Sequence, residues 1–241
     1  MIIHRLLFRY FKYGDDELFY RMQAENAIAW LKKAGLDFAP NTQALDLGCG
    51  HGLFGAILRQ EKCTVTFADQ ANHLRPELDS ARFVQIDLDQ DDYSKVGQYD
   101  LVVCSNVFEH LARPQQFIQQ IHKMLRPTGK LYLSWTNWLS PFGGHDFAPL
   151  HYFGPRFGRW LNFKLKGKWS DHVPYAGLYP TYIGQTLKML RQNADLKIMR
   201  MATRYYTEFS FILRIPVLRE FLAWNCALLI GRRSVTPQRL R

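Results

Sequence analysis

The chain has 241 residues, of which 47% are hydrophobic and 22% are charged, and its formal net charge is +10. A chain of this length and composition can bury a full core, which excludes a disordered tail. Its most apolar stretch is interrupted by Arg214, Pro216 and Arg219, so we expect no transmembrane helix. The four cysteines lack C-x-x-C spacing, which indicates reduced thiols in a cytoplasmic protein and argues against a disulfide or zinc framework.

Basic residues are concentrated near both ends of the chain and between residues 156 and 168. A surplus of this size suits contact with nucleic acid, with anionic lipid or with a phosphorylated substrate. It is equally compatible with a solvated basic surface that has no specific partner.

The order of the predicted elements indicates an α/β fold. Apolar residues at helical spacing predict a helix over 15–34 that ends near Gly35, and we expect residues 1–36 to form a helical N-terminal cap. From there on, short apolar strands alternate with helices. Strands are expected at 44–47, 65–68, 82–86, 99–104 and 130–135, and helices at 53–60 and 114–125, with a turn at 127–129. Such alternation builds a parallel sheet whose ligands bind at the carboxyl ends of the strands.

A glycine-rich loop follows the first predicted strand. Gly48, Gly50 and Gly52 lie between this strand and a helix, where they let the backbone approach a ligand near the free N–H groups of the helix. Asp46 precedes the loop and can order it or accept a hydrogen bond from an amino group. This pattern alone would also fit a nicotinamide or flavin dinucleotide.

Two further acids narrow the choice of ligand. Asp69 ends the second strand, at the spacing of an acid that holds the two ribose hydroxyls. Asp87 ends the third strand, where a carboxylate can accept a hydrogen bond from the amine of an adenine. The set suits a nucleoside that carries an amino acid in place of a pyrophosphate.

These motifs, with the segment 100–111 (DLVVCSNVFEHL), resemble the motif series of class I S-adenosylmethionine-dependent methyltransferases over about residues 43–135. The resemblance implies a Rossmann-like seven-stranded sheet, mostly parallel with an antiparallel last strand. It also implies S-adenosylmethionine as the cofactor and S-adenosylhomocysteine as the product.

The same resemblance assigns roles to residues. The loop glycines would border the methionyl part, Asp69 would hold the ribose, and Asn106 would line the sulfonium. The expected cofactor-binding residues are Tyr20, Asp46, Gly48, Cys49, Gly50, Gly52, Asp69, Gln70, Asp87, Leu88 and Asn106.

The acceptor is expected to bind residues 136–181, an aromatic-rich insertion within a methyltransferase domain at 37–241. Methyl transfer to a hydroxyl needs a group that removes the proton, and a histidine is suited to this task. The candidates are His145 with Asp146 beside it, His110 and His151. No spacing in the sequence predicts a metal site, although some sugar O-methyltransferases use a metal.

The chemical class of the acceptor follows from a second resemblance. The segments 135–146 (WTNWLSPFGGHD) and 151–154 (HYFG) resemble poorly characterised bacterial methyltransferases, notably actinobacterial ones, that are linked to cell-envelope glycans. This favours a saccharide or glycolipid hydroxyl. RNA or a small aromatic or quinone-type metabolite is an alternative acceptor, and a non-catalytic protein that binds the cofactor is a third possibility.

Methylation of a nucleobase amine is disfavoured by one segment. Enzymes of that kind commonly carry an Asn/Asp-Pro-Pro-aromatic sequence after the fourth strand, where this chain has Ser105-Asn106-Val107-Phe108.

The carboxyl-terminal part predicts the end of the sheet. We expect a helix at 182–193, a sixth strand at 196–206 and an antiparallel seventh strand at 225–232. The connection 209–224 either packs on the core or lies on an anionic membrane through an apolar face flanked by Arg214 and Arg219. The second case would place the protein peripherally at the inner face of the plasma membrane.

Overall fold

The computed structural model describes residues 2–14 and 16–233. Its centre is a sheet of seven strands, which are β1 (Gln43–Leu47), β2 (Thr64–Asp69), β3 (Arg82–Gln85), β4 (Tyr99–Ser105), β5 (Leu125–Thr136), β6 (Leu196–Thr203) and β7 (Asn225–Arg232). The α-helices are α1 (Ile3–Tyr13), α2 (Glu17–Lys33), α3 (Leu53–Gln60), α4 (Pro114–Gln120), α5 (Pro155–Lys166), α6 (Ile183–Gln192) and α7 (Leu218–Leu222). The 3-10 helices are η1 (Pro76–Leu78), η2 (Tyr93–Val96), η3 (Phe108–His110), η4 (Ile121–Met124), η5 (His145–Phe147), η6 (Leu150–Phe153) and η7 (Thr207–Arg214).

The strands lie in the order β3-β2-β1-β4-β5-β7-β6. The strands β1 to β5 pair in parallel, and β7 runs antiparallel to both β5 and β6. The predicted α/β sheet with an antiparallel last strand is therefore confirmed. The order of the strands reverses between β1 and β4, and ligands of such sheets bind outside the carboxyl ends at this point.

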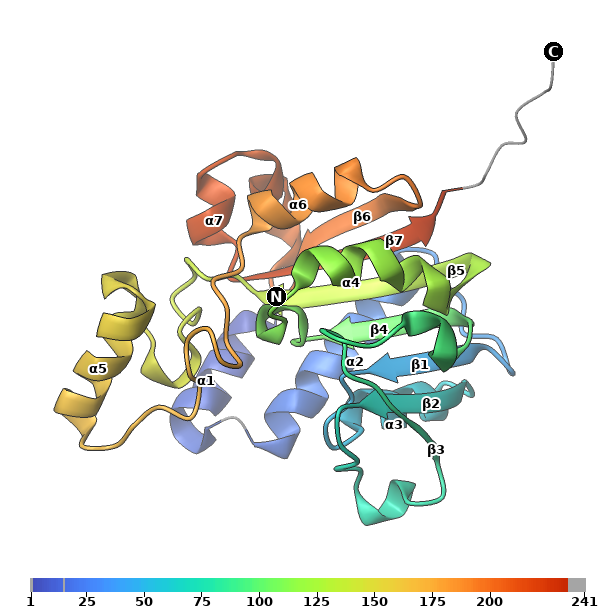
Figure 1. Ribbon diagram of the computed structural model, residues 1–241, viewed down its shortest axis with the longest axis horizontal. Helices are drawn as coiled ribbons and strands as arrows, with labels where there is room; N and C mark the ends of the chain where they lie inside the picture. The colour runs from blue at the N-terminus through green and yellow to red at the C-terminus, as the bar shows by residue number, and fades with distance from the viewer. Residues whose placement is uncertain (1, 15, 234–241) are drawn as a thin grey trace.

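Alternating side chains of β4 face two hydrophobic layers. Val102 and Cys104 belong to the cluster that includes the buried faces of α4 and α6. Leu101 and Val103 belong to the cluster that includes α2 and α3. Figure 1 shows the sheet between these two helical layers, with α1 and α5 beyond the end toward which the parallel strands point.

The N-terminal helices are only partly as predicted. The helix expected over 15–34 is α2, and its buried residues Ala27, Ile28 and Leu31 pack in the same cluster as α3, so α2 is part of the main core. A separate helix, α1, precedes it inside the region 1–36 that was expected to be helical, although only the helix over 15–34 was predicted with its own boundaries. It buries Leu6 and exposes much of its apolar surface, with Phe11 77% exposed.

Two strand boundaries also differ from the prediction. The turn expected at 127–129 lies inside β5, because the register with β4 shifts between the pairs Tyr99–Leu125 and Leu101–Lys130 and the extra residues form an irregularity. The sixth strand ends at Thr203, because η7 follows shortly after it.

The predicted insertion contains η5, η6 and α5 and has a small core of its own, formed by Trp138, Phe147 and Leu178. Within the described residues, no helix combines the length and apolar character needed to cross a bilayer. The tail 234–241, the end of the predicted methyltransferase domain, lies outside the described residues.

Candidate active site

The glycine-rich loop is held against the end of β2 by one carboxylate. The backbone N–H of Gly50 donates to Oδ2 of Asp69 over 2.8 Å, and that of Gln70 donates to Oδ1 over 2.7 Å. Gly48 has a φ of +70°, and a Cβ there would lie 2.2 Å from Cγ2 of Val107 in the loop after β4. The loops after β1, β2 and β4 thus form one packed unit at the switch point of the sheet.

Asp46 stabilises the same loop from inside the protein. Its side chain is 4% exposed and accepts a hydrogen bond from the N–H of Gly55 over 2.7 Å. Burial, with a smaller contribution from the charge of Asp69, raises the pKa of Asp46 to about 7. Asp46 therefore orders the start of α3, one of the two roles expected for it.

Cys49 and Gly52 also have structural surroundings. Cys49 is 9% exposed, and burial raises the pKa of its thiol well above the usual value. Gly52 caps α3 in the left-handed conformation, and a Cβ there would meet Leu74 and Leu78.

A first cavity of about 460 Å³ opens beside this loop. It is lined by predicted cofactor-binding residues from four segments, which are Gly48, Asp69, Gln70, Leu88 and Asn106.

Asp87 was predicted for the same site, but it lines an adjoining hollow that shares Gln70 with the first cavity. Its carboxylate accepts hydrogen bonds from the N–H of Asp89 over 2.8 Å and from Gln90 over 2.9 Å, so it stabilises the turn after β3.

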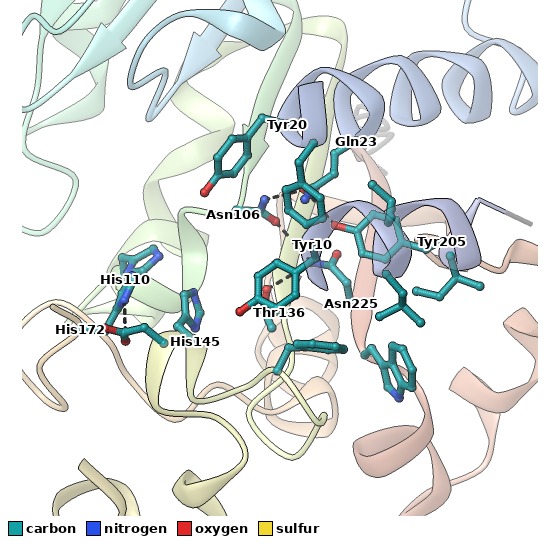
Figure 2. Close-up of a pocket in the computed structure, with 17 residues that line it drawn as sticks. Tyr10, Tyr20, Gln23, Asn106, His110, Thr136, His145, His172, Tyr205 and Asn225 are labelled. Carbon is teal, nitrogen blue, oxygen red and sulfur yellow. Dashed lines mark hydrogen bonds and ion pairs between the residues drawn. The ribbon is translucent and has the colours of Figure 1, made fainter. Parts of the chain in front are cut away.

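A second cavity of about 340 Å³ lies next to the first and shares Asn106 and His110 with it. Its aromatic lining comes from four parts of the chain. These are α1 with Tyr10, α2 with Phe19 and Tyr20, the segment after β5 with Phe142, and the carboxyl-terminal part with Tyr205 and Trp224. Figure 2 shows the labelled residues Tyr10 and Tyr20 on one side of this cavity and three histidines on the other.

Asn106 is fixed between the two cavities by a polar network. Its backbone is in the left-handed region with a φ of +57°. Its Nδ2 donates to Oε1 of Gln23 over 3.1 Å, and its Oδ1 accepts from Nη1 of Arg204 over 2.8 Å. Gln23 also accepts from the hydroxyl of Tyr205 over 2.9 Å, and Asn225 donates to Oδ1 of Asn106 over 3.3 Å. This network leaves the Asn106 amide a single orientation.

The histidine cluster consists of His110, His145 and His172. The centroid of the His145 ring lies 5.3 Å from that of His110 and 4.6 Å from that of His172. Burial and the two neighbouring rings lower the pKa of His145 to about 3, so this imidazole is neutral at pH 7. All three rings line the second cavity, and His110 lines both cavities.

The structure changes two details of the predicted catalytic set. Asp146 was expected to act on its sequence neighbour His145, but its Oδ1 accepts from Nδ1 of His172 over 3.0 Å. His151 is 1% exposed, and its Nε2 lies 3.1 Å from the carbonyl oxygen of Ser140, away from the residues that line either cavity. His151 is therefore buried in the insertion and lines neither cavity, whereas His110 and His145 line the second one.

The aromatic residues of the insertion serve mainly other purposes. Phe142 lines the second cavity and Tyr179 contributes a hydrogen-bonded segment to the wall of the first. Trp138 and Phe147 form the small core of the insertion, whereas the exposed Trp160 lies on α5.

Sequence reasoning missed His172, Gln23, Arg204 and Asn225. Gln23 carried a usable signal, since it is a polar residue on the buried face of α2, between Met22 and Ala24. The other three are distant in sequence from the motifs and reach the site through the fold alone.

Comparison with known proteins agrees with this architecture. A family model described as a methyltransferase domain matches residues 18–200. An uncharacterized methyltransferase of Mycobacteroides abscessus is 34% identical over 140 residues, which are 56% of this chain and 51% of that protein. One of Mycolicibacterium gilvum is 26% identical over 237 residues, which are 91% of this chain and 89% of that protein. The chain thus spans about half the length of the first of these relatives.

Solved structures show the same fold at low identity. An S-adenosylmethionine-dependent methyltransferase from Mesorhizobium loti has a TM-score of 0.55 and 19% identity, covering 86% of this chain and 98% of that one. Magnesium protoporphyrin IX methyltransferase from Synechocystis with bound SAH has a TM-score of 0.54 and 19% identity, covering 89% and 84%. Since the family model matches most of the sequence and these solved structures align with most of the chain, the chain belongs to the methyltransferase domain family and has the fold of S-adenosylmethionine-dependent methyltransferases.

Proposed function

We propose that the protein transfers a methyl group from S-adenosylmethionine to a hydroxyl group, most favourably that of a saccharide or glycolipid. The observation that carries this proposal is the pair of cavities that meet at Asn106 and His110. The first cavity is lined by the glycine loop and by Asp69, the acid that we expect to bind the ribose. The second cavity has an aromatic lining and contains the histidine cluster.

In this proposal the cofactor occupies the first cavity. The ribose hydroxyls bind Asp69, whose carboxylate oxygens keep acceptor capacity beyond the two N–H groups that they already bind. The methionyl part lies along Gly48 and Gly50, and the sulfonium methyl points past Asn106 into the second cavity. Tyr20 lines the second cavity beside Asn106 and covers the methyl from the N-terminal side.

The acceptor oxygen then approaches the methyl from the second cavity. Transfer proceeds by in-line displacement, in which the oxygen forms a bond to the methyl carbon while the carbon–sulfur bond breaks. The hydroxyl must lose its proton, and the histidine cluster is the group of ionisable side chains placed to promote this. Asp146 orients His172 and so has a positioning role.

The lining of the second cavity supports a compact acceptor with a ring. A volume of about 340 Å³ suits a monosaccharide-sized group, and the rings of Tyr10, Phe142 and Trp224 offer faces for stacking. The same apolar rings would suit a small aromatic metabolite, which is the second candidate acceptor. RNA is less well supported, because none of the described residues that line this cavity is a lysine or arginine.

We also propose that the protein contacts anionic membranes through η7 and α7. Their exposed apolar side chains include Phe211 at 58% and Phe221 at 46%, and Arg214 lies between them in sequence. Such a surface would bring the second cavity to a lipid-linked acceptor.

The first test is isothermal titration with S-adenosylmethionine, S-adenosylhomocysteine and NAD. We expect binding of the two sulfur compounds and none of NAD. Transfer of a labelled methyl group would then be measured with glycolipid, small-metabolite and RNA fractions. Label in the glycolipid fraction supports the proposal, label in another fraction identifies a rival acceptor, and cofactor binding without any transfer indicates a non-catalytic protein.

The histidines are tested by His110→Ala and His145→Ala. Each should lower the rate of transfer at least about tenfold, because general acid–base groups contribute at least that much. Each should leave the affinity for S-adenosylhomocysteine within a few-fold of the wild-type value. Full activity in both variants would remove the cluster from the mechanism.

A further inference from the structure

Three histidines from separate segments of the chain meet at one wall of the second cavity. His110 comes from η3, His145 begins η5, and His172 lies between α5 and α6. One ring nitrogen from each residue lies within 4.8 Å of the others. Figure 2 shows the three labelled rings grouped together, on the side of the cavity away from Tyr205. Each side chain is partly exposed, so the cluster is open to solutes in the cavity.

In all three rings, Nδ1 is the nitrogen that contacts a hydrogen-bond acceptor. Nδ1 of His110 donates to the carbonyl oxygen of Gly177 over 2.5 Å, and Nδ1 of His172 donates to Oδ1 of Asp146 over 3.0 Å. Nδ1 of His145 lies 3.4 Å from the carbonyl oxygen of Gly143, a longer contact of the same type. Carbonyl and carboxylate oxygens can only accept, so each Nδ1 carries the hydrogen and each Nε2 keeps a lone pair. A neutral imidazole in this tautomer is a ligand for a metal ion.

The surroundings of Asp146 match those that support metal-binding histidines in other proteins. Its carboxylate accepts from Oγ of Ser170 over 2.6 Å and from the N–H of Asp171 over 2.7 Å, in addition to His172. A carboxylate fixed in this way orients the ring and increases the basicity of its second nitrogen. The backbone of His145 is also in the left-handed region, with a φ of +51°, after Gly143 and Gly144.

We propose that His110, His145 and His172 bind a divalent first-row transition-metal ion of the zinc type at the wall of the second cavity. Three histidines and one open position form the ligand set of catalytic zinc sites. A tetrahedral ion with bonds of about 2.1 Å needs ligand nitrogens about 3.4 Å apart. The ring nitrogens lie within 4.8 Å of one another, so they must close in by up to about 1.4 Å on binding. The open position faces the cavity, where an oxygen of the acceptor completes the coordination.

The role of the ion rests on the proposed function, whereas the binding of the ion does not. A coordinated hydroxyl has a lowered pKa and releases its proton to solvent. The resulting oxygen attacks the methyl carbon, the carbon–sulfur bond breaks, and its electron pair stays on the sulfur of S-adenosylhomocysteine. In this arrangement the histidines hold the ion, and none of them needs to accept the proton directly.

Titration with cobalt(II) tests the site directly. The full-length protein, freed of any histidine tag and treated with EDTA, is titrated with Co²⁺ alone while its visible absorption is recorded. We expect one Co²⁺ per chain with the intense absorption of a four-coordinate ion, and displacement of Co²⁺ by added Zn²⁺. Absence of saturable binding by the wild-type protein overturns the proposal, whatever the variants do.

Three variants and one control assign the ligands. His110→Ala and His172→Ala should lose the cobalt absorption, and Asp146→Asn should weaken binding roughly 10- to 100-fold, as for other supporting carboxylates. His122→Ala is the matched control, because His122 lies on η4 near Asp195 and outside the cluster. Circular dichroism and thermal unfolding report whether each variant is folded. Wild-type cobalt binding by folded His110→Ala and His172→Ala overturns the assignment.

The two proposals fail in distinguishable ways. Stoichiometric cobalt binding without methyl transfer would retain the metal site and remove the proposed function. Methyl transfer that survives EDTA in a protein without cobalt binding would retain the function and remove the metal site.

Discussion

Asp69 is the residue at which the geometry of the glycine loop coincides with the proposed binding of the ribose. Both of its carboxylate oxygens already hold backbone N–H groups, at Gly50 and at Gln70. An ionised carboxylate has about four acceptor positions, so it can hold the loop and still accept from two hydroxyls. A neutral amide cannot do both.

Asp69→Asn is therefore expected to weaken binding of S-adenosylhomocysteine at least about tenfold, or about 1.4 kcal/mol. The side-chain NH₂ group of the asparagine replaces one carboxylate oxygen, so a backbone N–H or a ribose hydroxyl loses its acceptor. Isothermal titration measures the change. Asp37→Asn is the control, since Asp37 is exposed and lines neither cavity. Unchanged affinity in Asp69→Asn would remove Asp69 from the cofactor site.

Asp46 predicts a pH dependence of stability. Its pKa is raised by burial to about 7, above the usual value of 3.8, so its protonated form is favoured in the folded state. The stabilisation of the folded protein by the protonated Asp46 is fully present below about pH 4 and is lost as the pH rises through 7. Above pH 7 the protein bears the cost of a buried carboxylate.

Asp46→Asn removes this titration and can keep the hydrogen bond from Gly55, because the amide oxygen is also an acceptor. The difference in free energy of unfolding, variant minus wild type, is expected to increase from pH 5 to pH 8 in urea denaturation of the cofactor-free protein. Asp37→Asn should show a difference that does not change with pH. A constant difference for Asp46→Asn would refute the raised pKa.

At the scale of elements, the loop between β1 and α3 depends on its contact with the loop after β4. Gly48 and Gly50 both have positive φ values, but they differ in their surroundings. A Cβ on Gly48 would lie 2.2 Å from Cγ2 of Val107, whereas a Cβ on Gly50 would meet nothing within 4 Å. A substitution at Gly50 therefore tests the cost of backbone strain alone, whereas a substitution at Gly48 adds the cost of a steric clash.

Gly50→Ala should cost about 1 kcal/mol of stability, the penalty of a left-handed conformation for an ordinary residue. Gly48→Ala should cost more, because the loops must also move apart. Thermal unfolding of both variants measures this, and Val107→Ala combined with Gly48→Ala should recover part of the loss. Equal destabilisation by the two single variants would contradict the packing described for this loop.

Element boundaries were predictable wherever local pattern and packing agree. The helix expected at 53–60 is α3, because it has an apolar face at the helical period. The strand expected at 225–232 is β7, because a short continuous apolar run is typical of a strand buried on both faces. The boundaries of α1 within the predicted helical cap could not be predicted, because its apolar side chains are balanced by His4, Arg5 and Arg9 and its packing against α2 depends on the fold.

At the scale of the whole molecule, exposed apolar surface is concentrated on helices outside the sheet. If η7 and α7 contact anionic membranes, the protein should sediment with vesicles that contain phosphatidylglycerol and remain in solution with phosphatidylcholine vesicles. Phe211→Ser combined with Phe221→Ser should reduce the bound fraction several-fold, because two exposed rings leave the interface.

Met199→Ser is the matched control for this experiment, since Met199 is 48% exposed and lies on β6. Equal binding by the double variant and the wild-type protein would show that η7 and α7 do not contact the membrane.

The meeting of several predicted cofactor-binding residues at the first cavity could be predicted from the sequence, because these residues follow directly after strands. Gly48, Asp69 and Asn106 each lie at the carboxyl end of a parallel strand, and a parallel sheet brings these ends to one edge. Asp87 also follows a strand, but its side chain is taken up by the turn in which it lies. That outcome depends on local hydrogen bonds that the strand pattern does not reveal.

The amino-acid sequence by itself determined the sheet, the glycine loop and the class of cofactor, since each depends on residues close together in the chain. Only the tertiary structure decided which histidines meet and what Asp146 binds. His110, His145 and His172 come from three separate segments, and no pattern in the sequence predicts that these segments meet. His151 was a candidate as well, but it is buried within the insertion. The physical reason is that local patterns set secondary structure, whereas contacts between distant segments depend on how those segments pack.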